Sequence, residues 1–317
     1  MYKFLKNIIL FLMFLIFLGE IIVRMFHLVS DIPKRVITNH GIQKYVPNQE
    51  GYWKGGHHKW MINDKGWPGE LPLKFDNLIL LIGDSFIENF MNPNNCHQAA
   101  FLKNYMPQNN FMEAGRSGVS LIEAMEICEE LNHLKPLINT IYLNNNDFYE
   151  SIVEIQELND ITQLELKNKK IIKGKLKSPG LKIILYNWKL AYYLYNRFSP
   201  ATMQMNEKTE SKNKDNIIAA NTFKHQKEVF ELIEYISSNY GITNKILIFH
   251  PDSDQNIINK CIAEGFKVIV LNTREGQGWT FDYDSHWTCY GHEQAAKQIA
   301  GQLPKIIEDI KNNSIND

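Results

Sequence analysis

The sequence predicts an α/β domain, with a parallel sheet covered by helices on both faces, that follows an N-terminal membrane helix. Three observations lead to this prediction: short apolar runs recur along the chain, helical stretches separate most of them, and one long apolar segment stands at the N-terminus. Strands that alternate with helices form a parallel sheet. With 317 residues, 44% of them hydrophobic and 22% charged, the chain can bury the core of such a domain.

The apolar segment near the N-terminus has three interpretations. An unbroken apolar run spans Ile8–Leu18, and Glu20 interrupts the pattern before Ile21–Val23. A run of this length fits the core of a cleaved signal peptide, an uncleaved signal anchor or the buried helix of a cytosolic protein. A buried helix is disfavoured because the run has no polar face. Cleavage is disfavoured because the weak candidate site near Ser30 lies too far from the run.

We therefore expect an uncleaved, single-pass anchor. From Phe4 to Val23 the segment reaches the ~20 residues that a bilayer requires. Lys3 and Lys6 precede the apolar run, which places the N-terminus in the cytoplasm and the remainder of the chain outside it. The expected organisation is a signal anchor over residues 1–29 and one periplasmic or otherwise extracytoplasmic domain over residues 30–317.

The strands and helices of this domain are expected after a turn-rich lead-in from Ser30 to Phe75, in which Met61–Asn63 is a candidate edge strand. Leu78–Ile82 is a continuous apolar run that ends in Gly83, the pattern of a strand buried on both faces. Similar runs follow at Phe111–Met112, Ile141–Leu143, Ile246–Phe249 and Val268–Leu271. Helices are expected at about Leu121–Leu134, Thr222–Asn239, Asp254–Glu264 and Glu293–Lys311.

The alternation of strands and helices stops between about residues 150 and 220, which we interpret as an insertion. Leu164–Leu176 resembles a polar hairpin, Ile183–Phe198 predicts one aromatic-rich helix, and the polar stretch Ser199–Asp215 predicts a mobile loop. Such an insertion could cover an active site. Its aromatic side chains are expected to pack rather than to form a platform for a ligand.

Charge and motifs exclude some functions. Lys and Arg number 34 against 35 Asp and Glu, for a net charge of −1, whereas a dedicated nucleic-acid binder carries a clear basic excess. The chain has neither a GxxxxGKS/T nor a GxGxxG motif, so nucleotide-dependent chemistry has no support. His292 and Glu293 are expected on a helix surface, since HEQAA is not the HExxH zinc motif, and no metal site is predicted.

The sequence contains four cysteines: Cys96, Cys128, Cys261 and Cys289. In an exported domain they allow three pairings into two disulfides. Their wide spacing shows neither a CxxC nor a zinc pattern, so buried free thiols are at least as consistent with the sequence as bridges. Both possibilities stay open.

Polar side chains follow the predicted strands at the edge where a parallel sheet binds its ligands, the carboxyl ends of the strands. They are Gly83-Asp84-Ser85 after the first strand, Gly115-Arg116-Ser117-Gly118 after the second, Asn144-Asn145-Asn146-Asp147 after the third, and Asp284-Ser285-His286 before the last helix. A serine, a glycine that exposes its backbone, an amide side chain and an Asp–His pair are the components of acyl transfer by a serine nucleophile.

Ser85 and His286 are the candidate nucleophile and base. A serine hydroxyl is a poor nucleophile until a neutral imidazole accepts its proton, and a carboxylate fixes which ring nitrogen is free to accept. Asp284, two residues before the histidine, and Asp282, four before it, are both available as that carboxylate. Chain proximity favours Asp284.

Three groups are candidates for an oxyanion hole. The tetrahedral intermediate of acyl transfer carries a negative oxygen, so N–H donors must already point at it. Gly118 lets its backbone N–H approach without a side chain in the way. Asn146 offers a side-chain NH₂, and Ser85 its own backbone N–H.

Together these blocks resemble the SGNH (GDSL-type) hydrolases, which are named for a catalytic Ser, Gly, Asn and His. The matching residues are Gly83-Asp84-Ser85 for the first block, Gly118 for the second, Asn146-Asp147 for the third and the stretch around His286 for the last. The resemblance implies a three-layer α/β/α, flavodoxin-like sheet and a reaction that needs neither a metal nor an organic cofactor. It covers about Met61–Tyr149 and Asn244–Leu303, and leaves out the insertion.

Two further segments narrow the resemblance. The lead-in Ile62–Trp67 and the DxHWTxxGH form at Asp284–His292 look like exported or membrane-anchored members related to polysaccharide acetylesterases and acetyltransferases.

Two positions depart from the usual pattern. Asn144 stands where the third block usually has Gly, and Tyr283 stands where the usual acid would be.

The expected function is that of a serine esterase or acyltransferase that acts on an ester-linked acyl group. Acetyl on a cell-surface or exported glycan is the favoured substrate. One alternative is a lipase or thioesterase with a larger acyl pocket under the aromatic insertion. The other is a non-catalytic glycan-binding or assembly protein that keeps the fold. The sequence does not indicate an oligomeric state.

Overall fold

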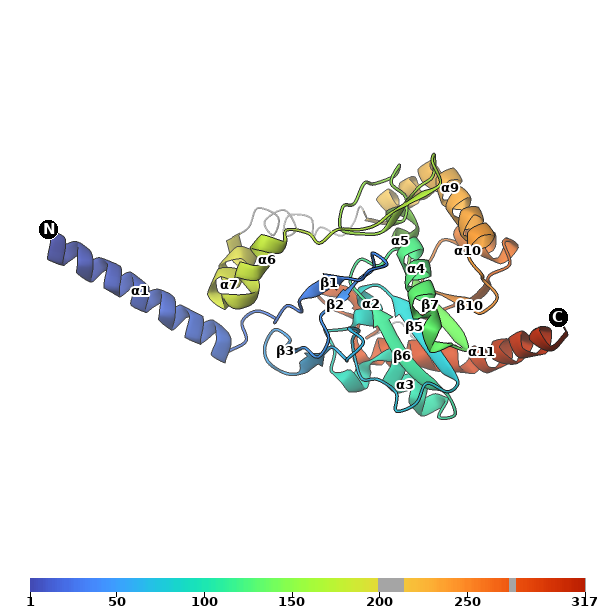
Figure 1. Cartoon of the computed structure of the whole chain (residues 1–317), viewed down its shortest axis with the longest axis horizontal. Coiled ribbons are helices and arrows are strands. Elements are labelled where there is room, and N and C mark those ends of the chain that lie inside the picture. The colour runs from blue at the N-terminus through green and yellow to red at the C-terminus, as the bar shows by residue number, and fades with distance from the viewer. Residues whose placement is uncertain (199–213, 274–277, 317) are drawn as a thin grey trace.

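The protein is described by a computed structural model over residues 1–198, 214–273 and 278–316. Its centre is a parallel sheet of five strands in the order β11-β10-β7-β5-β6 (Figure 1). Their bounds are Leu78–Gly83 for β5, Asn110–Gly115 for β6, Ile138–Leu143 for β7, Lys245–Phe249 for β10 and Lys267–Val270 for β11. In chain order this is 2-1-3-4-5, the flavodoxin-like arrangement. All five predicted strands are present, and the predicted sheet is confirmed.

Helices cover both faces of the sheet, because successive residues of a strand point to opposite sides. Leu78, Leu80 and Ile82 of β5 pack on one face, and Ile79 and Leu81 pack on the other. The first face is covered by α4 (Leu121–Leu131), α9 (Lys214–Asn239) and α10 (Gln255–Ala263). The second is covered by α3 (Gln98–Tyr105) and α11 (Cys289–Asn316). The three-layer α/β/α domain is therefore confirmed.

The lead-in forms two small antiparallel sheets of its own. The first pairs β1 (Arg35–Ile37) with β2 (Gln43–Tyr45), and the second pairs β3 (Glu50–Tyr52) with β4 (Lys59–Met61). The candidate edge strand Met61–Asn63 is thus displaced, since Met61 ends β4 and Ile62 makes only an isolated bridge to Pro68. Trp60 and Ile62 are buried together with Tyr45, so this segment is part of the folded domain.

The insertion has two parts. A hairpin of β8 (Gln163–Glu165) and β9 (Lys170–Ile172) turns as predicted and buries Leu164 against the main core. After it, α6 (Pro179–Asn187) and α7 (Lys189–Phe198) replace the single helix expected over Ile183–Phe198. That expectation is wrong because Trp188 is extended, at φ −121 and ψ 94. The predicted mobile loop Ser199–Asp215 falls almost wholly outside the described residues.

The N-terminal helix α1 (Tyr2–Met25) extends away from the domain (Figure 1). Among helices in the described ranges, it alone has the length and hydropathy, 2.5 over its most apolar window, to cross a bilayer. Most of its side chains are exposed, and only Val23 near its end is buried. The end of α1 contacts α7.

One of the open cysteine pairings is resolved. Cys96 and Cys289 form a disulfide, whereas Cys128 and Cys261 are buried free thiols. Cys96 ends a short 3-10 helix, η1 (Asn94–Cys96), and Cys289 begins α11. The bridge therefore joins two segments 193 residues apart in sequence. A second short 3-10 helix, η2 (Asn132–Leu134), follows α4.

Candidate active site

Ser85 stands at the junction of β5 and the short helix α2 (Ser85–Glu88). Asp84 caps this helix, since its Oδ1 accepts a hydrogen bond from the N–H of Phe86 at 3.0 Å. Gly83 ends the strand where a Cβ would lie 2.7 Å from Ile87 Cγ1, so only glycine allows α2 to pack this closely. The sharp turn presents Ser85 at the carboxyl end of β5, an inner strand of the sheet.

His286 lies beside Ser85 although it comes from the other end of the chain. Its Nε2 is 2.7 Å from Ser85 Oγ. Asp284 Oδ1 contacts Nδ1 of the same ring and also accepts a hydrogen bond from the His286 backbone N–H at 2.9 Å. Asp282, the other candidate acid, is exposed in the turn between β12 (Thr280–Phe281) and β13 (Asp284–Trp287). The structure therefore joins Ser85, His286 and Asp284 in one hydrogen-bonded chain.

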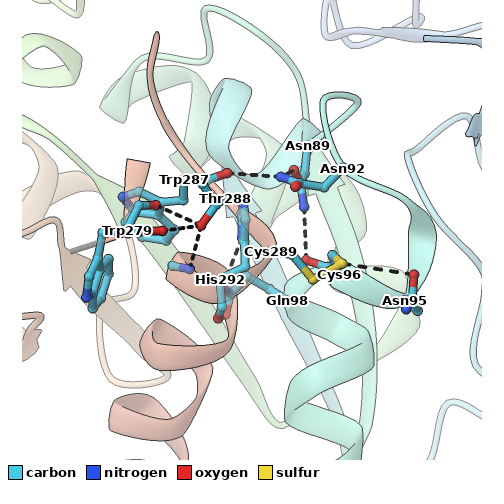
Figure 2. Close-up of a disulfide and its surroundings, with 12 residues drawn as sticks. Asn89, Asn92, Asn95, Cys96, Gln98, Trp279, Trp287, Thr288, Cys289 and His292 are labelled. Carbon is cyan, nitrogen blue, oxygen red and sulfur yellow. Dashed lines mark hydrogen bonds between the residues drawn. A yellow bond between two sulfur atoms is a disulfide. The ribbon is translucent and has the colours of Figure 1, made fainter. Parts of the chain in front are cut away.

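The hairpin that carries His286 is held in place by a polar and covalent cluster (Figure 2). Asn92 donates its side-chain N–H to the carbonyl of Trp287 at 3.0 Å and to Oδ1 of Asn89 at 2.7 Å. Asn89 in turn donates to the carbonyl of Cys96 at 3.1 Å, and Cys96 is bonded to Cys289. The residues after His286 are thus fixed to the segment that follows α2, which itself begins at Ser85.

A cluster of aromatic rings adjoins the imidazole of His286. The ring of Phe86 stacks on it, with centroids 4.8 Å apart, and contacts Trp287 edge-on. His250, which follows β10, packs against both Phe86 and Trp287. Burial, together with repulsion from His286, lowers the pKa of His250 to about 3. This second histidine is therefore neutral and supports the site through packing.

The three predicted oxyanion donors follow adjacent strands. Ser85 follows β5, Gly118 follows β6 and Asn146 follows β7, and β5 lies between the other two strands. Within the described residues, neither the Ser85 and Gly118 N–H groups nor the Asn146 side-chain amide has a protein acceptor. Gly118 has φ +81, a conformation that favours glycine, and Asn146 is exposed. These three groups therefore remain the candidate oxyanion donors.

Asn144, which departs from the family pattern, links the ends of β5 and β7. Its amide donates to Oδ2 of Asp84 at 3.2 Å, and its Oδ1 accepts from the N–H of Asn146 at 2.8 Å. Asp147 completes the cap of α5 (Asn145–Glu150) by accepting from the Asn144 N–H at 2.7 Å. Burial is the main reason that the pKa of Asp84 rises to about 6, and burial with the nearby charge of Asp84 raises the pKa of Asp147 well above its usual value.

Other residues that sequence reasoning missed hold the loop of Gly118. Arg116 is buried and donates to the carbonyl of Ser117 and to the carboxylate of Glu123, each at 2.7 Å. Glu88 accepts from the Ser117 N–H at 2.8 Å and contacts the hydroxyl of Tyr45. The sequence did contain a signal for the Arg116–Glu123 pair. It is an arginine after a predicted strand, seven residues before a glutamate on the inner side of a predicted helix.

His292 is buried, so its expected place on the helix surface is wrong. Gln98 donates to its Nδ1 at 3.1 Å and to its carbonyl at 2.8 Å, which binds α3 to α11 (Figure 2). Burial lowers the pKa of His292 well below its usual value. In the part of the chain that the structure describes, no three His, Cys, Asp or Glu side chains are grouped to hold a metal ion.

A hollow of about 670 Å³ opens beside Ser85 and His286. Its other lining residues come from the lead-in, from α2 and the segment after it, from the loop after β6, and from the turn and start of β13: Trp53, Lys54, Gly55, Glu88, Phe90, Met91, Ser117, Tyr283 and Asp284. The helices α6 and α7 of the insertion contribute none of its described lining residues. The lead-in, rather than the aromatic part of the insertion, contributes to the lining of this hollow.

Comparison with known proteins gives matches among solved structures. Neither the protein-family models nor the curated proteins contain a match. The psychrotrophic esterase EstA from Pseudoalteromonas sp. matches at 10% identity and a TM-score of 0.39, over 74% of this chain and 100% of that one. A GDSL-like lipase from Bacteroides thetaiotaomicron matches at 12% identity and a TM-score of 0.31, over 76% of this chain and 92% of that one. A likeness this weak says nothing about the activity of this chain, which depends on the geometry of its own site.

Proposed function

We propose that this protein is a serine ester hydrolase or acyltransferase of the SGNH type. The hydrogen-bonded chain from Asp284 through His286 to Ser85 is the observation that carries the proposal. A serine oxygen 2.7 Å from an imidazole nitrogen whose other nitrogen contacts a carboxylate is the arrangement that activates a serine nucleophile. Acyl transfer also requires hydrogen-bond donors for the negative carbonyl oxygen. The backbone N–H of Gly118 and the side-chain amide of Asn146, which follow the strands on either side of β5, are candidates for this role.

The residues act in a fixed order. Ser85 Oγ attacks the ester carbonyl carbon while its proton passes to His286 Nε2, and Asp284 stabilises the imidazolium that results. The carbonyl oxygen becomes negative and accepts from Ser85 N–H, Gly118 N–H and Asn146. The ester C–O bond then breaks, and His286 returns the proton to the departing alcohol oxygen. Water or an acceptor hydroxyl releases the acyl group from Ser85 by the same steps in reverse.

The same proposal places the domain outside the cytoplasm, held by α1 in the membrane. Lys3 and Lys6, which come before the apolar run within α1, favour this orientation. The Cys96–Cys289 bridge supports it, because disulfides persist in oxidising compartments and are rare in the cytosol.

Acetyl on a surface or exported glycan remains the favoured substrate. The hollow beside Ser85 is open, and Tyr283 at its edge is 77% exposed. Together with Trp53 it offers aromatic faces against which sugar rings pack. The lipase or thioesterase alternative requires an acyl pocket under the aromatic insertion. It is less favoured because α6 and α7 contribute no described residue to the lining of the hollow.

A panel of esters tests the substrate class. The purified full-length protein is given aryl acetate, aryl esters of long acyl chains, and acetylated polysaccharide, with Ser85→Ala as the control. We expect release of acetate from the first and third, and transfer to an added sugar would identify an acyltransferase. Preference for long chains would favour the lipase, and no turnover of any ester would favour a glycan-binding or assembly protein.

A further inference from the structure

The helix pair α6–α7 has an apolar face without a partner in the described structure. On α6, Leu181 and Ile184 are three residues apart and so share one face of the helix, and Trp188 directly follows its last residue. Each is at least 44% exposed. On α7, Leu194, Tyr195 and Phe198 are likewise exposed, Phe198 to 63%. A helix pair with this much exposed apolar surface marks an interaction site.

This pair is fixed to the end of α1. The Glu20 carboxylate accepts hydrogen bonds from the backbone N–H groups of Lys189 at 3.1 Å and Leu190 at 2.7 Å, and so caps α7. Arg24 donates to the carbonyl of Asn187 at 2.8 Å, at the end of α6. Gly19 lies against Leu190, where a Cβ would be 3.1 Å from the leucine side chain.

A second anchor comes from the lead-in. Lys189 is buried, and its Nζ lies 2.7 Å from Oδ1 of Asp31. The start of α7 is therefore held from two sides, by the last turns of α1 and by the segment that follows it. The pair cannot leave the end of α1 without breaking these bonds.

The position of this contact along α1 sets the depth of the pair. At ~1.5 Å per residue, ~20 residues of a helix fill a hydrocarbon core ~30 Å thick. Counted from Phe4, where the expected anchor begins, these residues end at Val23, so the last turns of α1 reach the outer boundary of that core. Glu20 and Arg24 are polar groups suited to this boundary, and they are the groups that hold α6–α7.

We propose that α6–α7 lies in the outer interface of the same bilayer that α1 crosses, with its apolar face against the lipid. The occupant is lipid because the pair is bonded to the last turns of α1, the proposed membrane helix, and exposes apolar side chains at that level. Amphipathic helices lie at the boundary between headgroups and acyl chains, and Trp and Tyr favour that level. The inference rests on the proposed α1 anchor, and it gives the domain a fixed orientation to the membrane.

Depth-dependent quenching tests this placement in the full-length protein. Ile184→Cys and Ile262→Cys are each labelled with an environment-sensitive fluorophore and reconstituted into vesicles of phosphatidylcholine and phosphatidylglycerol. The two isoleucines are matched in exposure, 52% and 53%, but Ile262 lies on α10, away from α1. A quencher near the headgroup end of the acyl chain should quench the label at Ile184 several-fold more than the label at Ile262.

A third label, placed in α1, distinguishes a failure of the α6–α7 placement from a failure of the α1 anchor. Phe14→Cys lies in the middle of α1, and a quencher near the methyl end of the acyl chain should reach it if α1 crosses the bilayer. Quenching at Phe14 with equal, weak quenching at Ile184 and Ile262 would overturn the placement of α6–α7 and leave the anchor standing. No quenching at Phe14 or Ile184 would overturn both.

Discussion

Nε2 of His286 lies 2.7 Å from Oγ of Ser85, although 201 residues separate the two in the chain. His286 lies in strand β13, shortly before the last helix, and Ser85 follows β5, an inner strand of the sheet. Because Asn92 and the Cys96–Cys289 bridge both hold the His286 hairpin to the segment after α2, the distance depends on the fold around it.

The acid of this arrangement can be tested by two substitutions of the same kind. We expect Asp284→Ala to lower kcat/KM by about 10²–10⁴-fold, because the imidazole loses the group that fixes its tautomer. Asp282→Ala should change it little, since Asp282 is exposed. The measurement is hydrolysis of a short-chain aryl ester, with Ser85→Ala as the lower limit. A larger loss in Asp282→Ala would show that the acid is misassigned, and no loss in either would indicate a Ser–His dyad.

Asn146→Ala should lower kcat by about 10²–10³-fold, the usual effect of removing one oxyanion donor. KM should change less, because the donor is used mainly in the transition state. Stability should be unaffected, since the side chain is exposed and donates to no described residue. Steady-state kinetics and a thermal melt of the same variant check both expectations. Wild-type kcat in Asn146→Ala would remove this residue from the site.

His250 gives the fold a predictable response to acid. Its pKa is about 3 in the folded protein against 6.5 ordinarily, so below pH 6.5 the unfolded chain binds a proton that the folded protein does not. This contribution to stability is complete above pH 6.5 and is lost as the pH falls, by roughly 1.4 kcal/mol per pH unit. His250→Phe, which suits the contacts with Phe86 and Trp287, should lose stability less steeply between pH 7 and 5.

Urea denaturation in detergent at several pH values measures this difference. Other buried histidines, His292 among them, act in both proteins, so only the difference between the two slopes is assigned to His250. Parallel curves for the wild type and His250→Phe would show that His250 is protonated in the folded state or does not contribute.

The Cys96–Cys289 bridge should be present in protein isolated without reductant and should stabilise it. We expect Cys96→Ala with Cys289→Ala to lower the free energy of unfolding by about 2–5 kcal/mol. Mass spectrometry after alkylation detects the bridge, and denaturation measures its effect. Reductant should destabilise the wild type but not the double variant. Equal sensitivity of the two proteins to reductant would contradict this role.

The sheet could be predicted because its signal is local. The six residues of β5 are all buried, and a strand covered on both faces is apolar throughout. Helix α3 was missed because Gln98 and its neighbours are polar or small, and its buried Gln98 is explained only by a distant partner, His292. The break at Trp188 was also missed because its cause is distant in sequence: the group that caps α7 is the Glu20 carboxylate, 169 residues before Lys189.

The residues of the site also divide into those that local sequence predicts and those whose role depends on partners distant in the chain. Ser85, Gly118 and Asn146 each lie within three residues of the end of a strand, so their common edge follows from topology. Glu88 and Arg116 have ordinary roles on a helix or a loop when taken one at a time, and only the folded structure shows that both hold Ser117. The disulfide could not be predicted, because four cysteines do not specify their own pairing.

Covalent labelling of Ser85 tests the central claim most directly. A fluorophosphonate probe reacts with a serine only when a neighbouring base activates it, so we expect the full-length protein to be modified at Ser85, as located by peptide mass spectrometry. His286→Ala should reduce the rate of labelling by at least about 10²-fold, and Ser85→Ala should abolish it. Labelling that is absent from the wild type, or that proceeds at the same rate in His286→Ala, would contradict a serine nucleophile activated by His286.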